Sequence, residues 1–132
     1  MINIKKAVEQ CMSGFEAKES GELTAGFMFP DDFIGFQGHF PGSKILPGIC
    51  QIQCALCMLE KLHGKKVVLR EIISAKYFQP VLPSEELICR AGSTREASGD
   101  VVLKASFSMD NKKVSEMKLR VCVMQDKGGT GK

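Results

Sequence analysis

The second half of the chain alternates apolar and polar residues with a period of two, which is typical of strands in a sheet with one buried face. Residues 101–109 and 114–124 show this alternation most clearly, and residues 67–79 and 87–95 are two further strand candidates. Turn residues at 98–100 and 110–111 separate three of these segments, as they would in antiparallel hairpins. The predicted inward face carries Leu103, Ala105, Phe107, Met109, Met117, Leu119, Val121 and Val123.

The first half contains one segment with a clear helical period, from Pro47 to His63. Apolar residues cover nearly the whole circumference of this helix, which indicates that it is buried. Pro47 suits the first helical position, because the missing N–H of proline costs nothing there. Gly64 suits a left-handed cap directly after the last turn. We therefore expect one long central helix.

The segments before this helix predict smaller elements. Residues 3–12 have apolar positions at helical spacing, and residues 15–18 and 22–29 are typical of two strands joined by a turn. An irregular segment rich in glycine, phenylalanine and proline follows over residues 30–46. Together, the patterns predict an α+β fold, in which an antiparallel sheet of five to six strands packs against one long helix.

Composition and charge narrow the class of protein. With 132 residues, 44% hydrophobic and 25% charged, the chain has the size and composition of one globular domain. We assign that domain to residues 1–126 and a disordered tail to residues 127–132. A net charge of +3 is too small to indicate nucleic acid binding, and the apolar stretches are too interrupted to span a membrane. The N-terminal segment lacks the long apolar core of a secretory signal, so we expect a cytoplasmic protein.

Six cysteines lie inside apolar stretches, which favours free buried thiols over a disulfide framework. Three of them, Cys50, Cys54 and Cys57, have the spacing of an iron–sulfur cluster motif, but they lie along one side of the predicted helix. Packing is the stronger interpretation, and a three-thiolate zinc site would lack a fourth ligand nearby. We expect neither a metal nor another cofactor.

The candidate chemistry lies in the segment GHFPG at residues 38–42, which continues through residues 43–46 into the helix. His39 has the side chain best suited to transfer a proton near neutral pH. The first N–H groups of the helix, near Gly48 and Ile49, have no internal partner and carry partial positive charge from the helix dipole. Such groups polarise a carbonyl and stabilise an oxyanion. The residues alone are equally compatible with a structural turn that holds a hydrogen-bonded histidine.

The segment GHFPG, followed four residues later by PG at the start of a buried helix, resembles the signature of the β-hydroxyacyl-(acyl carrier protein) dehydratases. A second segment, AKYFQPVLP at residues 75–83, is similar to the family's K/R-F-x-x-P-V-x-P strand segment. With the strand order, the resemblance runs from about Phe15 to Met124. It implies a hotdog fold, a sheet wrapped around one long helix and paired into a dimer. It also implies removal of water from a β-hydroxyacyl thioester to give an enoyl thioester.

The resemblance maps the family's site onto this chain. The catalytic histidine is His39, and the backbone that binds the carbonyl is the helix start at Gly48. The family's acidic partner, contributed by the other subunit, lies fourteen residues after the histidine, and that position is Gln53 here. Apart from the resemblance, Phe36 and Phe40 are candidates to line an acyl tunnel, with filling of the core as the alternative.

Gln53 departs from the family pattern. An amide hydrogen-bonds a hydroxyl group but does not usefully transfer a proton at neutral pH, and losing one general acid or base costs about 10²–10⁴ in rate. The nearest carboxylate on the helix, Glu60, is seven residues further along, or roughly 10 Å of helix axis, too far to replace the acid. We still assign Gln53 to the site, as the residue that orients the substrate hydroxyl.

Three functions remain open. The first is a dehydratase with His39 as base, acting on thioesters of acyl carrier protein or coenzyme A. The second is a non-catalytic or half-catalytic subunit, whose histidine joins a carboxylate from a complete partner. The third is an acyl thioesterase, ranked last because position 53 carries no carboxylate. We expect a dimer, either of identical chains or with a paralogue, and no nucleic acid or membrane partner.

Overall fold

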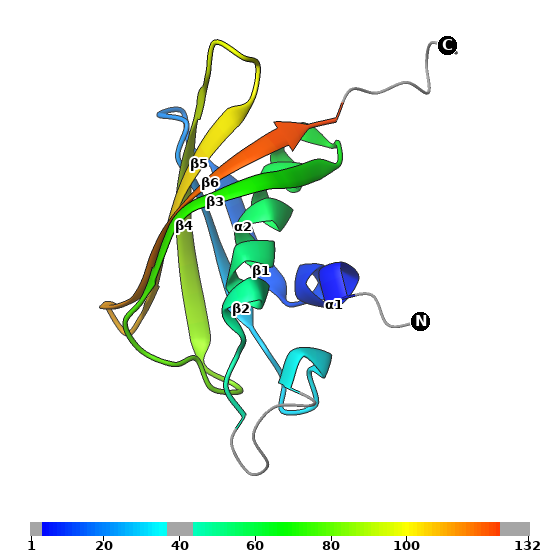
Figure 1. The fold of residues 1–132 in the computed structure, drawn as a ribbon. Coiled ribbons are helices and arrows are strands. Elements are labelled where there is room, and N and C mark those ends of the chain that lie inside the picture. Colours follow the sequence, from blue (N-terminus) through cyan, green and yellow to red (C-terminus); the bar gives the residue numbers. More distant parts are fainter. Residues whose placement is uncertain (1–3, 37–43, 125–132) are drawn as a thin grey trace.

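The computed structural model describes residues 4–36 and 44–124. The six strands of this part form one antiparallel sheet in the order β1-β2-β4-β5-β6-β3. One face of the curved sheet packs against the long helix α2, with the short helix α1 beside it (Figure 1). The predicted α+β architecture is confirmed. The elements are α1 (Ile4–Gln10), β1 (Met12–Ala17), β2 (Leu23–Met28), the 3-10 helix η1 (Ile34–Phe36), α2 (Gly48–His63), β3 (Val67–Tyr77), β4 (Glu86–Arg95), β5 (Val101–Met109) and β6 (Lys112–Val123).

The two C-terminal hairpins form as predicted. The turn from β4 to β5 passes through Gly99 at φ 96, and the turn from β5 to β6 has Asp110 and Asn111 at φ 50 and 65. Two successive left-handed residues match the right-handed twist of antiparallel strands in a tight hairpin. β5 has the predicted bounds, and β3, β4 and β6 differ from the predicted ones by at most two residues.

The N-terminal hairpin begins earlier than predicted. β1 starts at Met12, three residues before the expected start at residue 15, and α1 ends at Gln10. Pairing with β2 sets this start, since Met12 lies opposite Phe27. Gly14, at φ 62, lies where the register shifts. Such a bulge interrupts the period-two pattern, which is why the sequence signal begins only after it.

Helix α2 begins one residue later than predicted. Pro47 is extended, with φ −62 and ψ 148, and is therefore the N-cap rather than the first helical residue. Its carbonyl accepts a hydrogen bond from the backbone N–H of Cys50 at 3.0 Å. The C-terminal cap is as predicted, because Gly64 has φ 65 and donates its N–H to the carbonyl of Glu60 at 2.7 Å. Across residues 4–36 and 44–124, no helix has both the length and the apolar character needed to cross a membrane.

The core lies between α2 and the sheet. Every residue of α2 from Cys50 to Leu59 is buried except Gln53, which confirms a buried central helix. The predicted inward residues of β5 and β6 meet it, with Leu103 and Leu119 fully buried. Cys50, Cys54 and Cys57 pack in this core, and burial raises the pKa of each thiol. They stay protonated near neutral pH and act as small apolar residues, as predicted.

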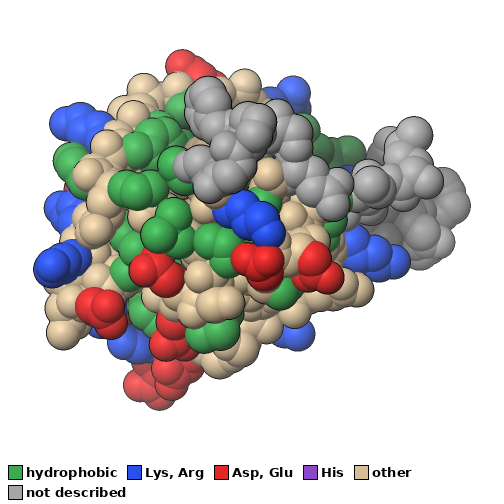
Figure 2. Space-filling view, turned by 90° about the horizontal axis from the view of Figure 1, so that it is seen from below, with side chains coloured by type: hydrophobic (Ala, Val, Ile, Leu, Met, Phe, Trp, Pro, Cys, Tyr) green, Lys and Arg blue, Asp and Glu red, His purple; other side chains and the backbone are tan. Residues whose placement is uncertain are grey.

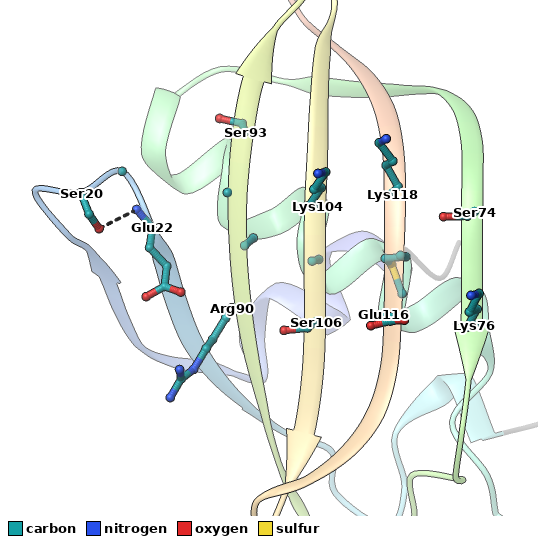
Figure 3. A pocket seen from close by; sticks show the side chains of 15 residues that line it. Ser20, Glu22, Ser74, Lys76, Arg90, Ser93, Lys104, Ser106, Glu116 and Lys118 are labelled. Atoms are coloured by element: carbon teal, nitrogen blue, oxygen red, sulfur yellow. Dashed lines mark hydrogen bonds between the residues drawn. The ribbon is translucent and has the colours of Figure 1, made fainter.

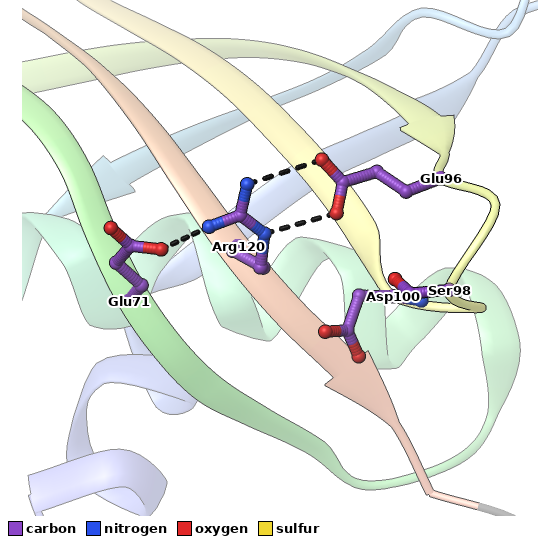
Figure 4. Close-up of polar contacts among 5 residues, drawn as sticks. All are labelled: Glu71, Glu96, Ser98, Asp100 and Arg120. Carbon is purple, nitrogen blue, oxygen red and sulfur yellow. Dashed lines mark hydrogen bonds and ion pairs between the residues drawn. The ribbon is translucent and has the colours of Figure 1, made fainter.

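An ion-pair network ties two strands and a turn together on the opposite face of the sheet (Figure 4). The guanidinium of Arg120 in β6 donates two hydrogen bonds to the carboxylate of Glu96, at 3.0 and 3.2 Å. It also pairs with Glu71 in β3. Donation from Arg120 lowers the pKa of the Glu96 carboxyl. The network is exposed to solvent, so we regard it as a register contact between strands rather than as chemistry.

Candidate active site

A pocket of about 370 Å³ opens where α2 begins. The segment before the helix is anchored to the β3–β4 connection, because the N–H of Leu46 donates to the carbonyl of Val81 at 2.8 Å. This bond joins the described part of the first motif to the second motif, although the two are far apart in the chain. Apolar side chains gather on this end of the molecule between charged ones (Figure 2). The pocket is lined by Ile45, Leu46, Gly48, Gln51, Tyr77, Phe78, Gln79 and Pro80.

Gly48 is approached closely by a neighbouring ring, which a side chain at this position would displace. A Cβ atom at this position would lie 2.7 Å from both Cζ and the hydroxyl oxygen of Tyr77. Tyr77 ends β3 and covers the first turn of α2 from the side of the sheet. Partial burial raises the pKa of its phenol, which therefore keeps its proton near neutral pH and acts as a hydrogen-bond donor.

The first turn of α2 has the free N–H groups that the sequence predicts. The N-cap residue, Pro47, makes no side-chain hydrogen bond to the first turn, and this turn contains no acidic residue. The first internal bond is donated by Cys50, so the N–H groups of Gly48 and Ile49 precede the helical ladder. The Ile49 side chain is 60% exposed. The helix start can therefore bind a carbonyl oxygen beside the pocket.

Gln51, which lines the same pocket, forms a buried polar pair with Ser115. The Ser115 hydroxyl, in β6, donates a hydrogen bond to the side-chain oxygen of Gln51 at 2.5 Å. Both residues are buried, with 2% and 0% of their surface exposed. Sequence reasoning did not assign this pair. The available signals were a glutamine inside an otherwise apolar helix and a serine at an odd-numbered position of β6, the parity of its inward-facing residues.

Gln53 lies on another side of α2. Residues two positions apart on a helix are separated by about 200° around its axis, so Gln53 and Gln51 point in nearly opposite directions. The amide of Gln53 donates to the sulfur of Cys57 at 3.5 Å, and the side chain is only half buried. It does not line the pocket formed within one chain. Its proposed place opposite the histidine of a second subunit stays a prediction.

Of the predicted phenylalanine and histidine site residues, the structure describes only Phe36. Phe36 is buried at the end of η1, and its ring makes an edge contact with Phe33 at 5.7 Å between centroids. It belongs to the core cluster, and its contact with an acyl chain stays a prediction. His39 and Phe40 lie outside the described residues.

The outer face of the sheet carries a larger, open hollow of about 760 Å³ (Figure 3). Charged side chains surround it, among them Lys76, Arg90, Lys104, Glu116 and Lys118. The ribbon of α2 lies behind the strands in this view, so the hollow is on the opposite side of the sheet. None of Phe36, Gly48, Ile49 and Gln53, the predicted site residues in the described part of the chain, lines it. The smaller pocket at the helix start is therefore the candidate active site.

Known proteins are similar to this chain in sequence and in fold. Residues 16–118 match the family described as ApeI-like: ApeI dehydratase. The 3-hydroxyacyl-(acyl-carrier-protein) dehydratase FabZ of Wolbachia sp. subsp. Drosophila simulans (strain wRi) is 35% identical over 99 residues, which cover 70% of this chain and 68% of that protein. Among solved structures, a chain of the dehydratase heterocomplex ApeI:P from Xenorhabdus doucetiae has a TM-score of 0.71 at 21% identity, covering 84% of this chain and 96% of that one.

The structural likeness confirms the predicted hotdog fold but does not choose a reaction. A putative thioesterase from Ralstonia eutropha JMP134, described as a phenylacetic acid degradation-related protein, also has this fold. Its TM-score is 0.61 at 16% identity, with 83% of each chain covered. One fold thus serves different chemistry. The sequence match decides the family, because residues 16–118 are most of the chain. The chain belongs to the ApeI-like dehydratase family.

Proposed function

We propose that this protein removes water from a 3-hydroxyacyl thioester carried on acyl carrier protein and forms the trans-2-enoyl thioester. The observation that supports this most is the pocket at the start of α2, where both motif segments meet beside uncapped N–H groups. The carrier is inferred from the FabZ relatives, which are 3-hydroxyacyl-(acyl-carrier-protein) dehydratases. Membership of a dehydratase family favours this reaction over thioester hydrolysis. We keep a cytoplasmic location as part of the proposal.

In the proposed reaction, the N–H groups of Gly48 and Ile49 bind the thioester carbonyl. The imidazole of His39 takes the proton from carbon 2, and negative charge develops on the carbonyl oxygen, where those N–H groups stabilise it. The double bond then forms between carbons 2 and 3 as the bond from carbon 3 to oxygen breaks. The departing oxygen accepts a proton and leaves as water. With an amide at position 53, that proton has to come from the imidazolium or from solvent.

The substrate side of the site is completed by the phenylalanine candidates and Gln53. We assign Phe36 and Phe40 to the wall that contacts the acyl chain. Gln53 is assigned to the hydroxyl end of the substrate, where its amide donates a hydrogen bond but no proton.

A second candidate function is that of a half-catalytic subunit in a heterodimer. Gln53 has no carboxyl group to supply, and the structural neighbour from Xenorhabdus doucetiae belongs to a dehydratase heterocomplex. In such a pair, His39 of this chain would work with a carboxylate of its partner. The reciprocal site, which depends on Gln53, would be weak.

The purified chain is expected to interconvert a 3-hydroxyacyl thioester and its enoyl product, and His39→Ala should lower the rate at least 10²-fold. The readout is enoyl thioester absorbance, followed in both directions. His63→Ala is the matched control, since His63 lies in the last turn of α2, at the other end of the helix from the pocket. Equal turnover by His39→Ala and the unchanged chain would remove His39 as the base. Turnover that appears only after a complete dehydratase is added would favour the second candidate.

The proposed dimer joins through β3, which is one edge of the sheet. This strand is 11 residues long, whereas β1 at the other edge has six. Val68 and Ile72 of β3 are exposed apolar residues, and Ile72 lies opposite Leu119 on the helix-facing side of the sheet. A long unpaired edge with apolar side chains is a template for strand pairing.

Sedimentation at micromolar concentration is expected to show a dimer, and Ile72→Lys should shift it to monomer. A buried lysine charge in each copy would oppose close pairing of two such edges. Met28→Lys is the control, because Met28 is equally exposed but belongs to β2. A dimer that withstands Ile72→Lys would place the contact elsewhere. A stable monomer of the unchanged chain would contradict the composite site.

A further inference from the structure

In the described part of the chain, Gln51 and Ser115 are the only buried polar residues. We propose that the carboxamide of Gln51, held by Ser115, recognises the 3-hydroxyl group of the substrate. This inference rests on the proposed dehydratase function and names the group that distinguishes a 3-hydroxyacyl chain from a saturated one. Gln51 is a substrate-binding residue in this role, since its amide transfers no proton.

The hydrogen bond to Ser115 fixes which end of the carboxamide faces the pocket. The separation of 2.5 Å fits an O–H···O bond and is shorter than an ordinary N–H···O bond, so the oxygen of Gln51 faces the serine. The nitrogen, with two N–H donors, has no hydrogen-bond partner among the described residues. No fully enclosed side-chain nitrogen or oxygen in the described part lacks a partner. The nitrogen is therefore accessible, and the cavity beside it is the pocket that Gln51 lines.

The pair joins α2, which lines the pocket, to β6, which is paired with β3 and its pocket-lining residue Tyr77. Ser115 lies opposite Tyr77 in the register of β3 and β6, so the serine and the ring that covers Gly48 are cross-strand neighbours. Both strands are anchored here, because the N–H of Phe78 donates to the carbonyl of Val114 at 2.7 Å. The carboxamide is thus held by a rigid support, which is the condition for recognising one position on a ligand.

The N–H groups at the start of α2 and the carboxamide of Gln51 form two polar subsites along the helix. Gln51 is three residues after Gly48, which corresponds to about 4.5 Å of helix axis. A 3-hydroxyacyl thioester has two oxygens at a comparable separation, the carbonyl oxygen and the hydroxyl oxygen two carbons away. When the helix N–H groups hold the carbonyl, the free N–H donors of Gln51 are left for the hydroxyl oxygen. A saturated chain has no group to accept them, and an unmatched buried donor is costly.

The test compares the binding of two inert ligands by calorimetry, namely the 3-hydroxyoctanoyl and octanoyl amides of pantetheine, with nitrogen in place of the thioester sulfur. We expect the unchanged protein to prefer the hydroxylated ligand by roughly 5- to 10-fold in Kd, the effect of about one neutral hydrogen bond. Gln51→Met has nearly the same shape but no donor, so the ratio should fall to about one. Ser115→Ala frees the carboxamide and should reduce the ratio as well. Gln10→Met, on the exposed end of α1, should leave it unchanged.

The ratio separates recognition from a merely structural role, because a packing defect weakens both ligands alike. A folded Gln51→Met or Ser115→Ala protein that keeps the full preference would overturn this proposal, as would an unchanged protein with no preference. Turnover of 3-hydroxyacyl thioesters, measured separately, tests the proposed function. If the protein turns over 3-hydroxyacyl thioesters but its preference for the hydroxylated ligand is unchanged in Gln51→Met, the role of Gln51 is refuted and the dehydratase function stands. If the preference for the hydroxylated ligand is lost in Gln51→Met but the unchanged protein shows no turnover, the dehydratase function is refuted and the role of Gln51 in binding the hydroxyl stands.

Discussion

Raising the pH from 9 to 11 is expected to unfold the protein through its buried cysteines. Cys50, Cys54 and Cys89 are at most 2% exposed. Burial raises the pKa of Cys50 to about 11, and it also raises the pKa values of Cys54 and Cys89. In the unfolded chain such thiols titrate at about 8.5. Near pH 9 and above, the unfolded state therefore loses protons that the folded state still holds.

The sign of the effect follows from this difference in bound protons. Because the folded pKa is raised, the stabilising contribution is fully present below the unfolded pKa and is lost as pH rises towards the folded value. Each thiol removes about 1.4 kcal/mol of unfolding free energy per pH unit in that window. Three thiols remove roughly 4 kcal/mol per pH unit, against a total stability of about 5–15 kcal/mol for an ordinary domain.

Urea unfolding at several pH values measures this slope, and thiolate absorbance reports when the cysteines ionise. Cys54→Ala should reduce the slope by about one proton, although it also lowers stability at neutral pH by leaving a small cavity. Cys122→Ala, at a cysteine that is only half buried, is the control for the substitution itself. A slope that stays the same in Cys54→Ala would contradict the assignment. So would thiolate absorbance, before the protein unfolds, that exceeds what the half-buried Cys11 and Cys122 can supply.

The elements that sequence predicts well are those whose signal is local. β5 was predicted with its observed bounds because strict alternation lies between two turns, Gly99 before it and Asp110–Asn111 after it. α2 was predicted within one residue, since Gly64 marks its end and apolar residues surround it. The early start of β1 was missed because pairing with β2, rather than the residues themselves, sets it. The edge position of β3 is likewise a property of the whole sheet.

The candidate site divides in the same way. The position of Gly48 and the free N–H groups beside it follow from the start of one helix, which the structure places at Gly48. Their binding of a substrate carbonyl stays a prediction. The close packing at this glycine does not follow from the helix alone, because the ring that a Cβ would displace is Tyr77, from another motif. Gln51 and Ser115 are 64 residues apart, and neither residue type indicates the other. Pairs of this kind become visible only when the sheet has brought the strands to the helix.

Gln53→Glu is expected to raise turnover of a 3-hydroxyacyl thioester by about 10²–10⁴, because it restores a general acid with almost no change in volume. The half-buried setting of Gln53 in one chain leaves its side chain available to a second subunit. The pH profile should acquire two limbs, one from His39 and one from the new carboxyl group. Some stability should be lost, since a partly buried carboxylate loses hydration unless it is hydrogen-bonded or protonated.

The matched control is Gln51→Glu, the same change two residues earlier on the same helix. It places a carboxyl group in the pocket of its own chain, on nearly the opposite side of α2, where the donor for the substrate hydroxyl is lost. Activity should not rise in that variant. A gain with Gln51→Glu alone would move the acid position into the pocket within one chain. A folded, dimeric Gln53→Glu protein with no gain on any 3-hydroxyacyl thioester tested would show that the missing acid is not the main deficit. That result would favour a pocket rebuilt around the amide for another substrate or for a partner subunit.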